Sequence, residues 1–127
     1  MQDIIKIHKV LADESRLRVL NLLMERSCCV CEVMQALEIS QSKASRILSA
    51  LHEAGILELH REGLWAVYSV DRTGMAPALK GIVEATTGAF SGNRQMAADR
   101  ERLRDAERVG PGCVNKGETT RELHKLA

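Results

Sequence analysis

Residues 32–70 read EVMQALEISQSKASRILSALHEAGILELHREGLWAVYSV, and their pattern is the clearest indication of the fold. Its first residues, 32–37, have apolar side chains at helical spacing and predict a short helix. The Glu38-Ile39-Ser40 sequence that follows is typical of a turn. Ser40 or Ser42 can cap a longer helix, which we expect to run as far as Ala54.

The second half of the stretch changes period. Gly55 is suited to end the helix, because glycine is the usual residue at that position. Residues 56–61 and 64–70 then alternate apolar and polar side chains on either side of Glu62-Gly63, which predicts a β-hairpin. A short helix, a turn, a longer helix and a hairpin make a winged helix-turn-helix, a mainly α fold with one β-hairpin.

Further helices are predicted on both sides of this stretch. One lies within residues 4–11, and another, capped by Asp13, spans residues 15–24. After the hairpin, helical spacing resumes from about Thr73, with Pro77 acceptable in the first turn.

A change in composition near residue 91 divides the chain of 127 residues. We interpret residues 1–90 as the winged helix-turn-helix domain. Residues 91–127 are highly charged and poor in apolar side chains, so we interpret them as an extension that is helical in part and disordered at its end.

The polar face of the helix after the turn is suited to DNA. Glutamine and arginine can contact base edges, while serine and lysine suit phosphates. An arginine at the hairpin could reach a phosphate or the minor groove. The predicted DNA-contacting residues are Gln41, Ser42, Lys43, Ser45, Arg46 and Arg61.

Composition limits the other functions open to the chain. The net charge of +1 excludes a globally basic protein, so contact with double-stranded DNA must come from a local patch. We find no phosphate-binding loop, no acid–base carboxylate pair and no nucleophile–histidine spacing, and we predict neither an enzyme nor an organic cofactor. The sequence has no membrane-spanning run and no signal-peptide pattern, so we expect a cytoplasmic protein without a membrane partner.

Three of the four cysteines lie within four residues, as Cys28, Cys29 and Cys31, and the fourth is Cys113. In a reducing compartment such clusters bind metals or act in redox chemistry more often than they form structural disulfides. Thiolates prefer soft, thiophilic ions. Because the cluster comes just before a helix, its thiol pKa values are expected to be lowered.

Several of these segments together resemble the ArsR/SmtB family of metal-responsive repressors. The resemblance covers residues 5–90 and includes LADESRLRVL at 11–20 and SQSKASRILSAL at 40–51. CVCEV at 29–33 is similar to the arsenic-sensing CVCD(L/V) box of that family, with Glu32 in place of aspartate. The resemblance implies a homodimer, joined through its first and last helices, that binds operator DNA and releases it when a metal or metalloid binds.

The sequence departs from the family box at one ligand position. The box usually has a third cysteine where this chain has Met34. As(III) and Sb(III) take three thiolates, whereas zinc normally takes four ligands. A site could therefore use Cys28, Cys29 and Cys31, or the last two with Cys113. On an ideal helix residues 28 and 31 share a face while 29 and 31 point apart, so gathering all three sulfurs would distort the helix.

The sequence leaves open other signals that a repressor with this fold could sense. A thiol-redox or persulfide sensor could pair Cys113 with a cysteine of the cluster. Relatives that sense cadmium or lead have additional N-terminal cysteines, and no cysteine precedes Cys28. A zinc site on the last dimer helix is excluded because residues 75–109 contain no histidine.

Overall fold

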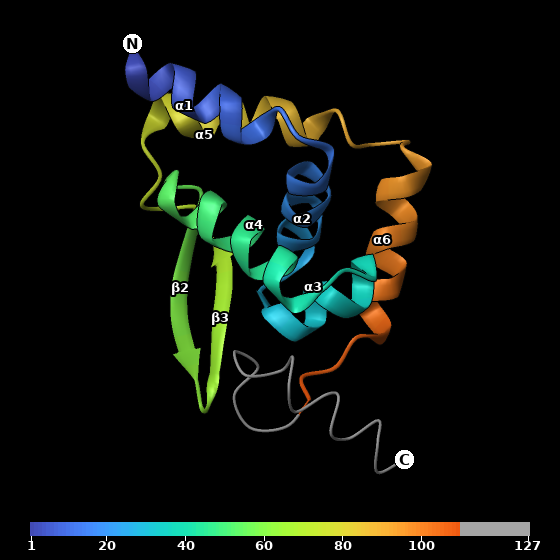
Figure 1. Cartoon of the computed structure of the whole chain (residues 1–127). Helices are drawn as coiled ribbons and strands as arrows, with labels where there is room; N and C mark the ends of the chain where they lie inside the picture. The colour runs from blue at the N-terminus through green and yellow to red at the C-terminus, as the bar shows by residue number, and fades with distance from the viewer. Residues whose placement is uncertain (110–127) are drawn as a thin grey trace.

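The computed structural model describes residues 1–109, so Cys113 and the predicted disordered end lie outside the described residues. The elements in chain order are α1 (Gln2–Leu11), α2 (Glu14–Glu25), β1 (Cys28–Cys29), α3 (Val30–Leu37), α4 (Gln41–Glu53), β2 (Leu57–Glu62), β3 (Trp65–Val70), α5 (Pro77–Gly88) and α6 (Arg94–Asp105). The mainly α winged helix-turn-helix predicted from the sequence is confirmed (Figure 1).

The helix-turn-helix is formed by α3 and α4, packed against α2. Asp13 caps α2 by accepting a hydrogen bond from the Arg16 amide at 2.9 Å. Of the two candidate caps for α4, Ser40 is the one used, and it accepts from the Lys43 amide at 3.1 Å. Glu38 turns the chain between the two helices in the left-handed conformation, with φ of 57°.

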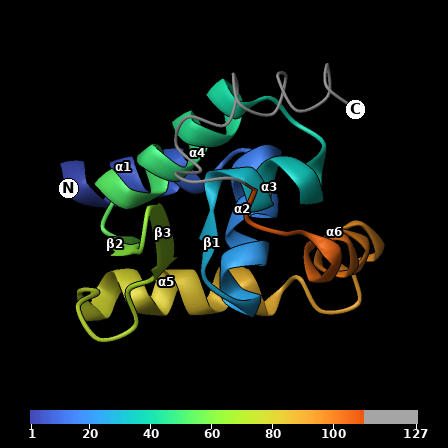
Figure 2. The same cartoon turned by 90° about the horizontal axis from the view of Figure 1, so that it is seen from below.

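The hairpin of β2 and β3 is the wing. Leu57 pairs with Val70 at its base and Glu62 with Trp65 next to the turn. Gly63 has φ of 62° in that turn, a conformation that glycine adopts without strain. The sequence did not predict a third strand, but β1 pairs with β3 on the edge opposite β2 (Figure 2).

The helix after the wing begins later than expected. We predicted a start near Thr73, but α5 begins at Pro77. Residues 71–75 form a turn instead, because the Asp71 carboxylate accepts a hydrogen bond from the Gly74 amide at 2.9 Å. In α5, Leu79 and Val83 face the core.

The partly helical extension predicted after residue 90 contains α6, which is capped by Asn93. This helix packs against α2 and α3 rather than standing in solvent. Its buried Leu103 belongs to the same apolar core as Leu20, Leu48 and Ile56. The charged surface of α6 is compatible with docking because Asp99, fully buried, forms a two-point ion pair with Arg18 at 2.8 and 2.9 Å.

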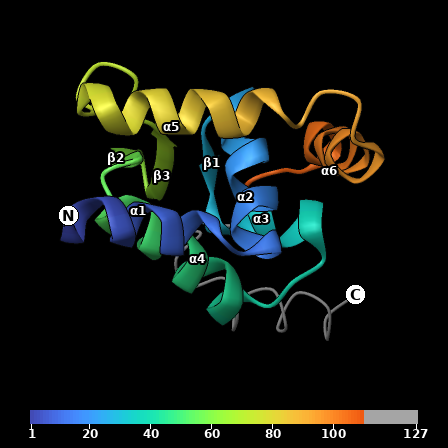
Figure 3. The same ribbon diagram turned by 90° about the horizontal axis from the view of Figure 1, so that it is seen from above.

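The arrangement separates two ends of the molecule. Helices α1 and α5 lie at the end away from the tip of the wing, while α6 lies against α2 and α3 (Figures 1 and 3). Ile4 and Ile5 of α1 are exposed. Within residues 1–109, no helix is both long and apolar enough to cross a membrane.

Candidate metalloid and DNA sites

Cys29 and Cys31 form a buried pair. Their Sγ atoms are 2.9 Å apart, and the side chain of Trp65 packs against them. The two cysteines are 0% and 3% exposed, so a ligand can reach them only if the structure opens locally. The indole Nε1 of Trp65 is buried and has no hydrogen-bond partner in the described part of the chain, which leaves an unused donor beside the pair.

Cys28 lies on a different side of the backbone. Because residues 28 and 29 form a strand, their side chains point to opposite faces. The Cys28 side chain belongs to the main core, and its thiol donates to the Arg26 carbonyl at 3.4 Å. The expectation based on an ideal helix was therefore wrong: Cys29 and Cys31 approach each other, and Cys28 points away from both.

The thiol chemistry of Cys28 also differs from the expectation. Burial, and secondarily the negative charge of Glu32, raises the pKa of Cys28 to about 12, whereas a position near a helix N-terminus was expected to lower it. The dipole of α3 does not compensate, because Cys28 precedes the helix and lies within the core. At neutral pH this side chain is a thiol in the folded protein.

Glu32 fixes the backbone at the cysteine pair. Its Oε1 accepts from the Cys29 amide at 2.9 Å, closing the first turn of α3. Its Oε2 accepts from Arg26 Nη1 at 2.5 Å, and Oε1 also accepts from Arg108 Nε at 3.2 Å. A nearly buried carboxylate with these partners holds the N-terminus of α3 in place.

The chain that follows α6 lies against Cys31, which the sequence did not predict. The Glu107 carbonyl lies 3.9 Å from Cys31 Sγ, as an acceptor for that thiol. Gln35 holds this segment at two points: its Nε2 donates to the Glu107 carbonyl at 2.6 Å, and its Oε1 accepts from the Glu107 amide at 3.1 Å. Residue 107 therefore lies next to the candidate site.

The described residues do not complete a three-ligand site. Among residues 1–109, no three side chains of histidine, cysteine, aspartate or glutamate converge as a metal site would require. Met34, which stands where the family has its third cysteine, is partly buried and packs against the main core. Cys113, the other candidate ligand, is outside the described residues.

The predicted DNA-contacting side chains are displayed as expected. On α4, Ser42, Lys43 and Arg46 are exposed while Ala44 and Leu48 are buried. The remaining candidates on this helix, Gln41 and Ser45, are partly exposed, and Arg61 is exposed on β2.

The structure adds one cation to this face. Arg16 of α2 lines a shallow cavity of about 280 Å³ together with Lys43, Arg46 and one acidic residue, Asp13. Nothing in the sequence associates Arg16 with α4, because the two meet through the packing of α2 on α4. Three cations around one hollow suit a phosphate of a DNA backbone.

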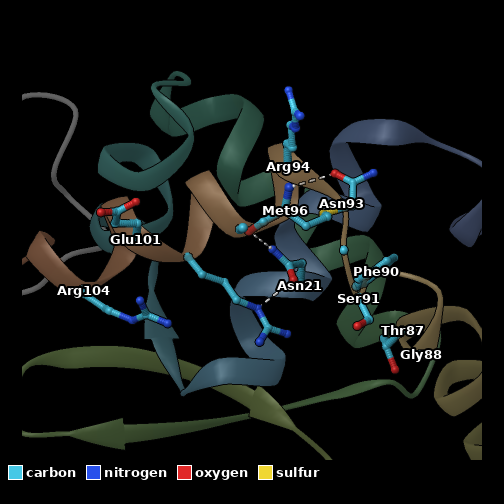
Figure 4. Close-up of a pocket in the computed structure, with 13 residues that line it drawn as sticks. Asn21, Thr87, Gly88, Phe90, Ser91, Asn93, Arg94, Met96, Glu101 and Arg104 are labelled. Carbon is cyan, nitrogen blue, oxygen red and sulfur yellow. Dashed lines mark hydrogen bonds between the residues drawn. The ribbon is translucent and has the colours of Figure 1, made fainter.

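A larger cleft of about 750 Å³ lies between the end of α5 and α6 (Figure 4). Asn21 lines it and is fully buried, but its amide is used: it donates to the Met96 carbonyl at 2.9 Å and accepts from Arg100 Nε at 2.8 Å. Arg104 is paired with Glu25. These polar groups hold α6 in place, and the cleft lies apart from the cysteines.

Comparison with known proteins shows where the chain belongs. Residues 13–58 match the family described as "Bacterial regulatory protein, arsR family". The arsenic resistance transcriptional regulator ArsR1 of Pseudomonas putida is 43% identical over 83 residues, which cover 62% of this chain and 65% of that protein. The arsenical resistance operon repressor of Escherichia coli is 43% identical over 82 residues, covering 64% of this chain and 70% of the repressor.

The solved structures give the same fold. Reduced HlyU from Vibrio cholerae superposes with a TM-score of 0.59 at 24% identity, covering 71% of this chain and 90% of HlyU. The relatives matched in sequence are named as regulators, and the family consists of regulatory proteins rather than enzymes, as predicted. The chain belongs to the arsR family of bacterial regulatory proteins.

Proposed function

We propose that this protein is a homodimeric transcriptional repressor that releases operator DNA when As(III) or Sb(III) binds at Cys29 and Cys31. The observation that carries the proposal is the 2.9 Å approach of the two sulfurs where β1 meets α3. The printed names of the Pseudomonas putida and Escherichia coli relatives, which refer to arsenic resistance, support the choice of inducer.

The chemistry of the pair suits a trivalent metalloid. As(III) and Sb(III) are thiophilic and pyramidal, and in the reduced protein Cys29 and Cys31 supply two of the three sulfurs required. Cys28 could supply the third only if β1 left β3 and a buried side chain left the core. Cys113 requires neither change, since it lies six positions after Glu107 in the chain, a stretch that can span up to about 20 Å. We therefore favour Cys113 as the third thiolate.

The DNA part of the proposal uses α4 and the wing. The second helix of a helix-turn-helix lies in the major groove, with the residues of its N-terminal part on base edges. The N-terminal half of α4 carries all five of the candidate side chains, Gln41, Ser42, Lys43, Ser45 and Arg46. In this arrangement Arg61 of the wing contacts the flanking backbone or minor groove.

A homodimer is proposed because α1 and α5 lie together at the end opposite the tip of the wing (Figure 1). Ile4 and Ile5 on α1 are 49% and 40% exposed, and burying them in a two-fold interface would remove apolar surface from water. Light scattering on the purified chain should give about twice the mass of 14.0 kDa. A variant with both isoleucines replaced by aspartate should be monomeric and bind operator weakly.

The central experiment measures operator binding with and without arsenite under full reduction. An operator is first selected from random duplexes with the purified protein, and binding is followed by fluorescence anisotropy. Saturating arsenite should weaken operator affinity by roughly 5- to 150-fold, the usual range of allosteric coupling. Cys29→Ser and Cys31→Ser should bind operator normally and lose this response.

Distinct outcomes identify the alternatives. Release only after oxidation or persulfide treatment would replace the metalloid proposal with a thiol-redox repressor. Release by cadmium or lead but not by arsenite would indicate the other soft-metal class. If no sequence is enriched in the selection, the repressor function itself is wrong.

A further inference from the structure

The cysteine pair and the wing belong to one structural unit. Cys29 pairs with Val67 of the wing, because β1 and β3 are neighbouring strands (Figure 2). Trp65, which packs against the pair, is also the residue opposite Glu62 in the hairpin. Anything that displaces the two sulfurs therefore acts directly on β3.

A side-chain bridge makes a second connection. Arg108 donates through Nε to Glu32 at 3.2 Å and through Nη1 to Glu62 at 2.8 Å. One guanidinium thus joins the carboxylate that caps α3 to the carboxylate at the end of β2. The chain that follows α6 runs from the end of the helix toward the side of the wing (Figure 1).

The electrostatics of the bridge agree with its geometry. The hydrogen bond from Arg108, followed by that from His60, lowers the pKa of Glu62. The same bond to Glu62, reinforced by Glu32, raises the pKa of Arg108 despite partial burial. Glu62 and Arg108 are therefore both charged at neutral pH.

A single arginine can serve both carboxylates only while they keep their separation. Glu32 is tied to the pair, because its Oε1 accepts from the Cys29 amide at 2.9 Å, so any shift of the first turn of α3 on inducer binding would move Glu32 as well. Such a shift would cost Arg108 one of its two partners.

We propose that Arg108 is a positioning residue that couples the cysteine pair to the wing, so that inducer binding is transmitted to the hairpin as well as to α4. This inference rests on the proposed function. It assigns a regulatory role to the segment after α6, and it makes Glu62 the receiving group on the wing.

Two variants with opposite effects on charge test the bridge in the full chain. Arg108→Gln leaves Glu62 without its cation and makes the wing more negative, whereas Glu62→Gln makes it less negative. Both remove the bridge, so the proposal expects the same defect from both. Arg104→Gln is the matched control, because Arg104 also lies on α6 but pairs with Glu25 of α2 rather than with a residue of the wing.

Each protein is titrated with operator in the absence and presence of saturating arsenite, and arsenite affinity is measured separately from the fluorescence of Trp65, the only tryptophan. Arg108→Gln and Glu62→Gln should reduce the arsenite-dependent change in operator affinity by about five-fold or more. Arsenite affinity should stay within about two-fold of the unmodified protein. Arg104→Gln should keep the full response.

Amide hydrogen exchange over residues 57–70 separates coupling from a general loss of stability. In the unmodified protein arsenite should speed exchange in the wing. In Arg108→Gln exchange there should already be fast, and arsenite should add little, while α2 and α4 keep their protection. Global loss of protection would assign Arg108 a structural role only and overturn the inference.

The outcomes distinguish the inference from the function on which it rests. An unmodified protein that keeps its operator in saturating arsenite overturns both. An unmodified protein that releases operator, together with an equally responsive Arg108→Gln variant, overturns the coupling role of Arg108 and leaves the proposed function standing.

Discussion

Among single residues, Glu32 connects most of the features near the cysteine pair. Its carboxylate accepts from the Cys29 amide, from Arg26 and from Arg108, and it is almost fully buried. The longer glutamate side chain in place of the aspartate of the family box still caps α3. Beside this cap, Cys29 and Cys31 pack against Trp65, while the side chain of Cys28 lies in the main core.

The side-chain direction of Cys28 leads to a prediction about the ligand set. Cys28→Ala should retain arsenite binding, because Cys28 points away from the pair, and should lower the free energy of unfolding by roughly 1 kcal/mol. Cys113→Ala should weaken arsenite binding without that loss of stability. Trp65 fluorescence during arsenite titration and urea unfolding measure the two quantities. Loss of arsenite binding in Cys28→Ala would show that β1 detaches to supply the third sulfur.

The cysteines also show what the sequence can and cannot predict about single residues. Their crowding made them candidate ligands, because that information is local. Their orientation depends on the pairing of Cys28 with Tyr68 and of Cys29 with Val67, some 40 residues along the chain. A strand of two residues is too short to show an alternating pattern, so we assumed helical geometry. That geometry places Cys28 and Cys31 on one face, whereas in the structure Cys29 and Cys31 are the neighbours.

Among the elements, those specified by local signals were predicted well. The caps Asp13 and Ser40 and the turn glycine Gly63 all act within a few residues of their position. The start of α5 was misplaced because the Asp71 side chain stabilises a turn that competes with helix. The exposed face of α4 follows from the helical period, so the DNA candidates there were predicted from spacing alone.

Helix α4 provides the second prediction. Lys43→Gln and Arg46→Gln should each weaken operator binding, because each removes a cation from the exposed face beside Arg16. If a residue contacts one phosphate, the slope of log affinity against log salt should fall by about 0.9. Arsenite affinity should not change.

Arg94→Gln is the control for this experiment, since Arg94 is exposed on α6, outside the helix-turn-helix and the wing. Anisotropy titrations at several salt concentrations provide the measurement. An equal loss of affinity in the control would mean that general charge, rather than α4, governs binding.

For the molecule as a whole, the docking of α6 is the feature that the sequence concealed. Its residues are mostly charged, and they predicted a helix with little to pack. The buried Asp99 joins Arg18, Arg102 and Gln95, and the pairing with Arg18 spans 81 positions in the chain. No local pattern reports which partner a charge will find after folding.

The third prediction concerns this ion-pair cluster. Asp99→Asn should lower the free energy of unfolding by about 3 kcal/mol or more, because it leaves Arg18 and Arg102 without their buried counter-ion. In the folded protein the hydrogen bond to Asp99 raises the pKa of Arg18, which reflects the charge pairing that the variant loses. Thermal unfolding gives the stability, and limited proteolysis after residue 90 reports the undocking of α6.

Glu101→Gln on the exposed side of α6 serves as the control and should change stability by no more than about 0.5 kcal/mol. If Asp99→Asn unfolds at the same temperature as this control, the cluster does not hold α6 on the fold.

The burial of the cysteine pair also has a kinetic consequence. Because Cys29 and Cys31 are buried and Gln35 holds Glu107 against Cys31, we expect the proposed capture of an inducer to require a local opening at this segment. In stopped-flow mixing, the observed rate should stop rising at high arsenite concentration, at a plateau equal to the opening rate. Gln35→Ala should raise the plateau. The time in which a cell responds to a sudden dose would then be set by two hydrogen bonds of one glutamine rather than by the reactivity of sulfur.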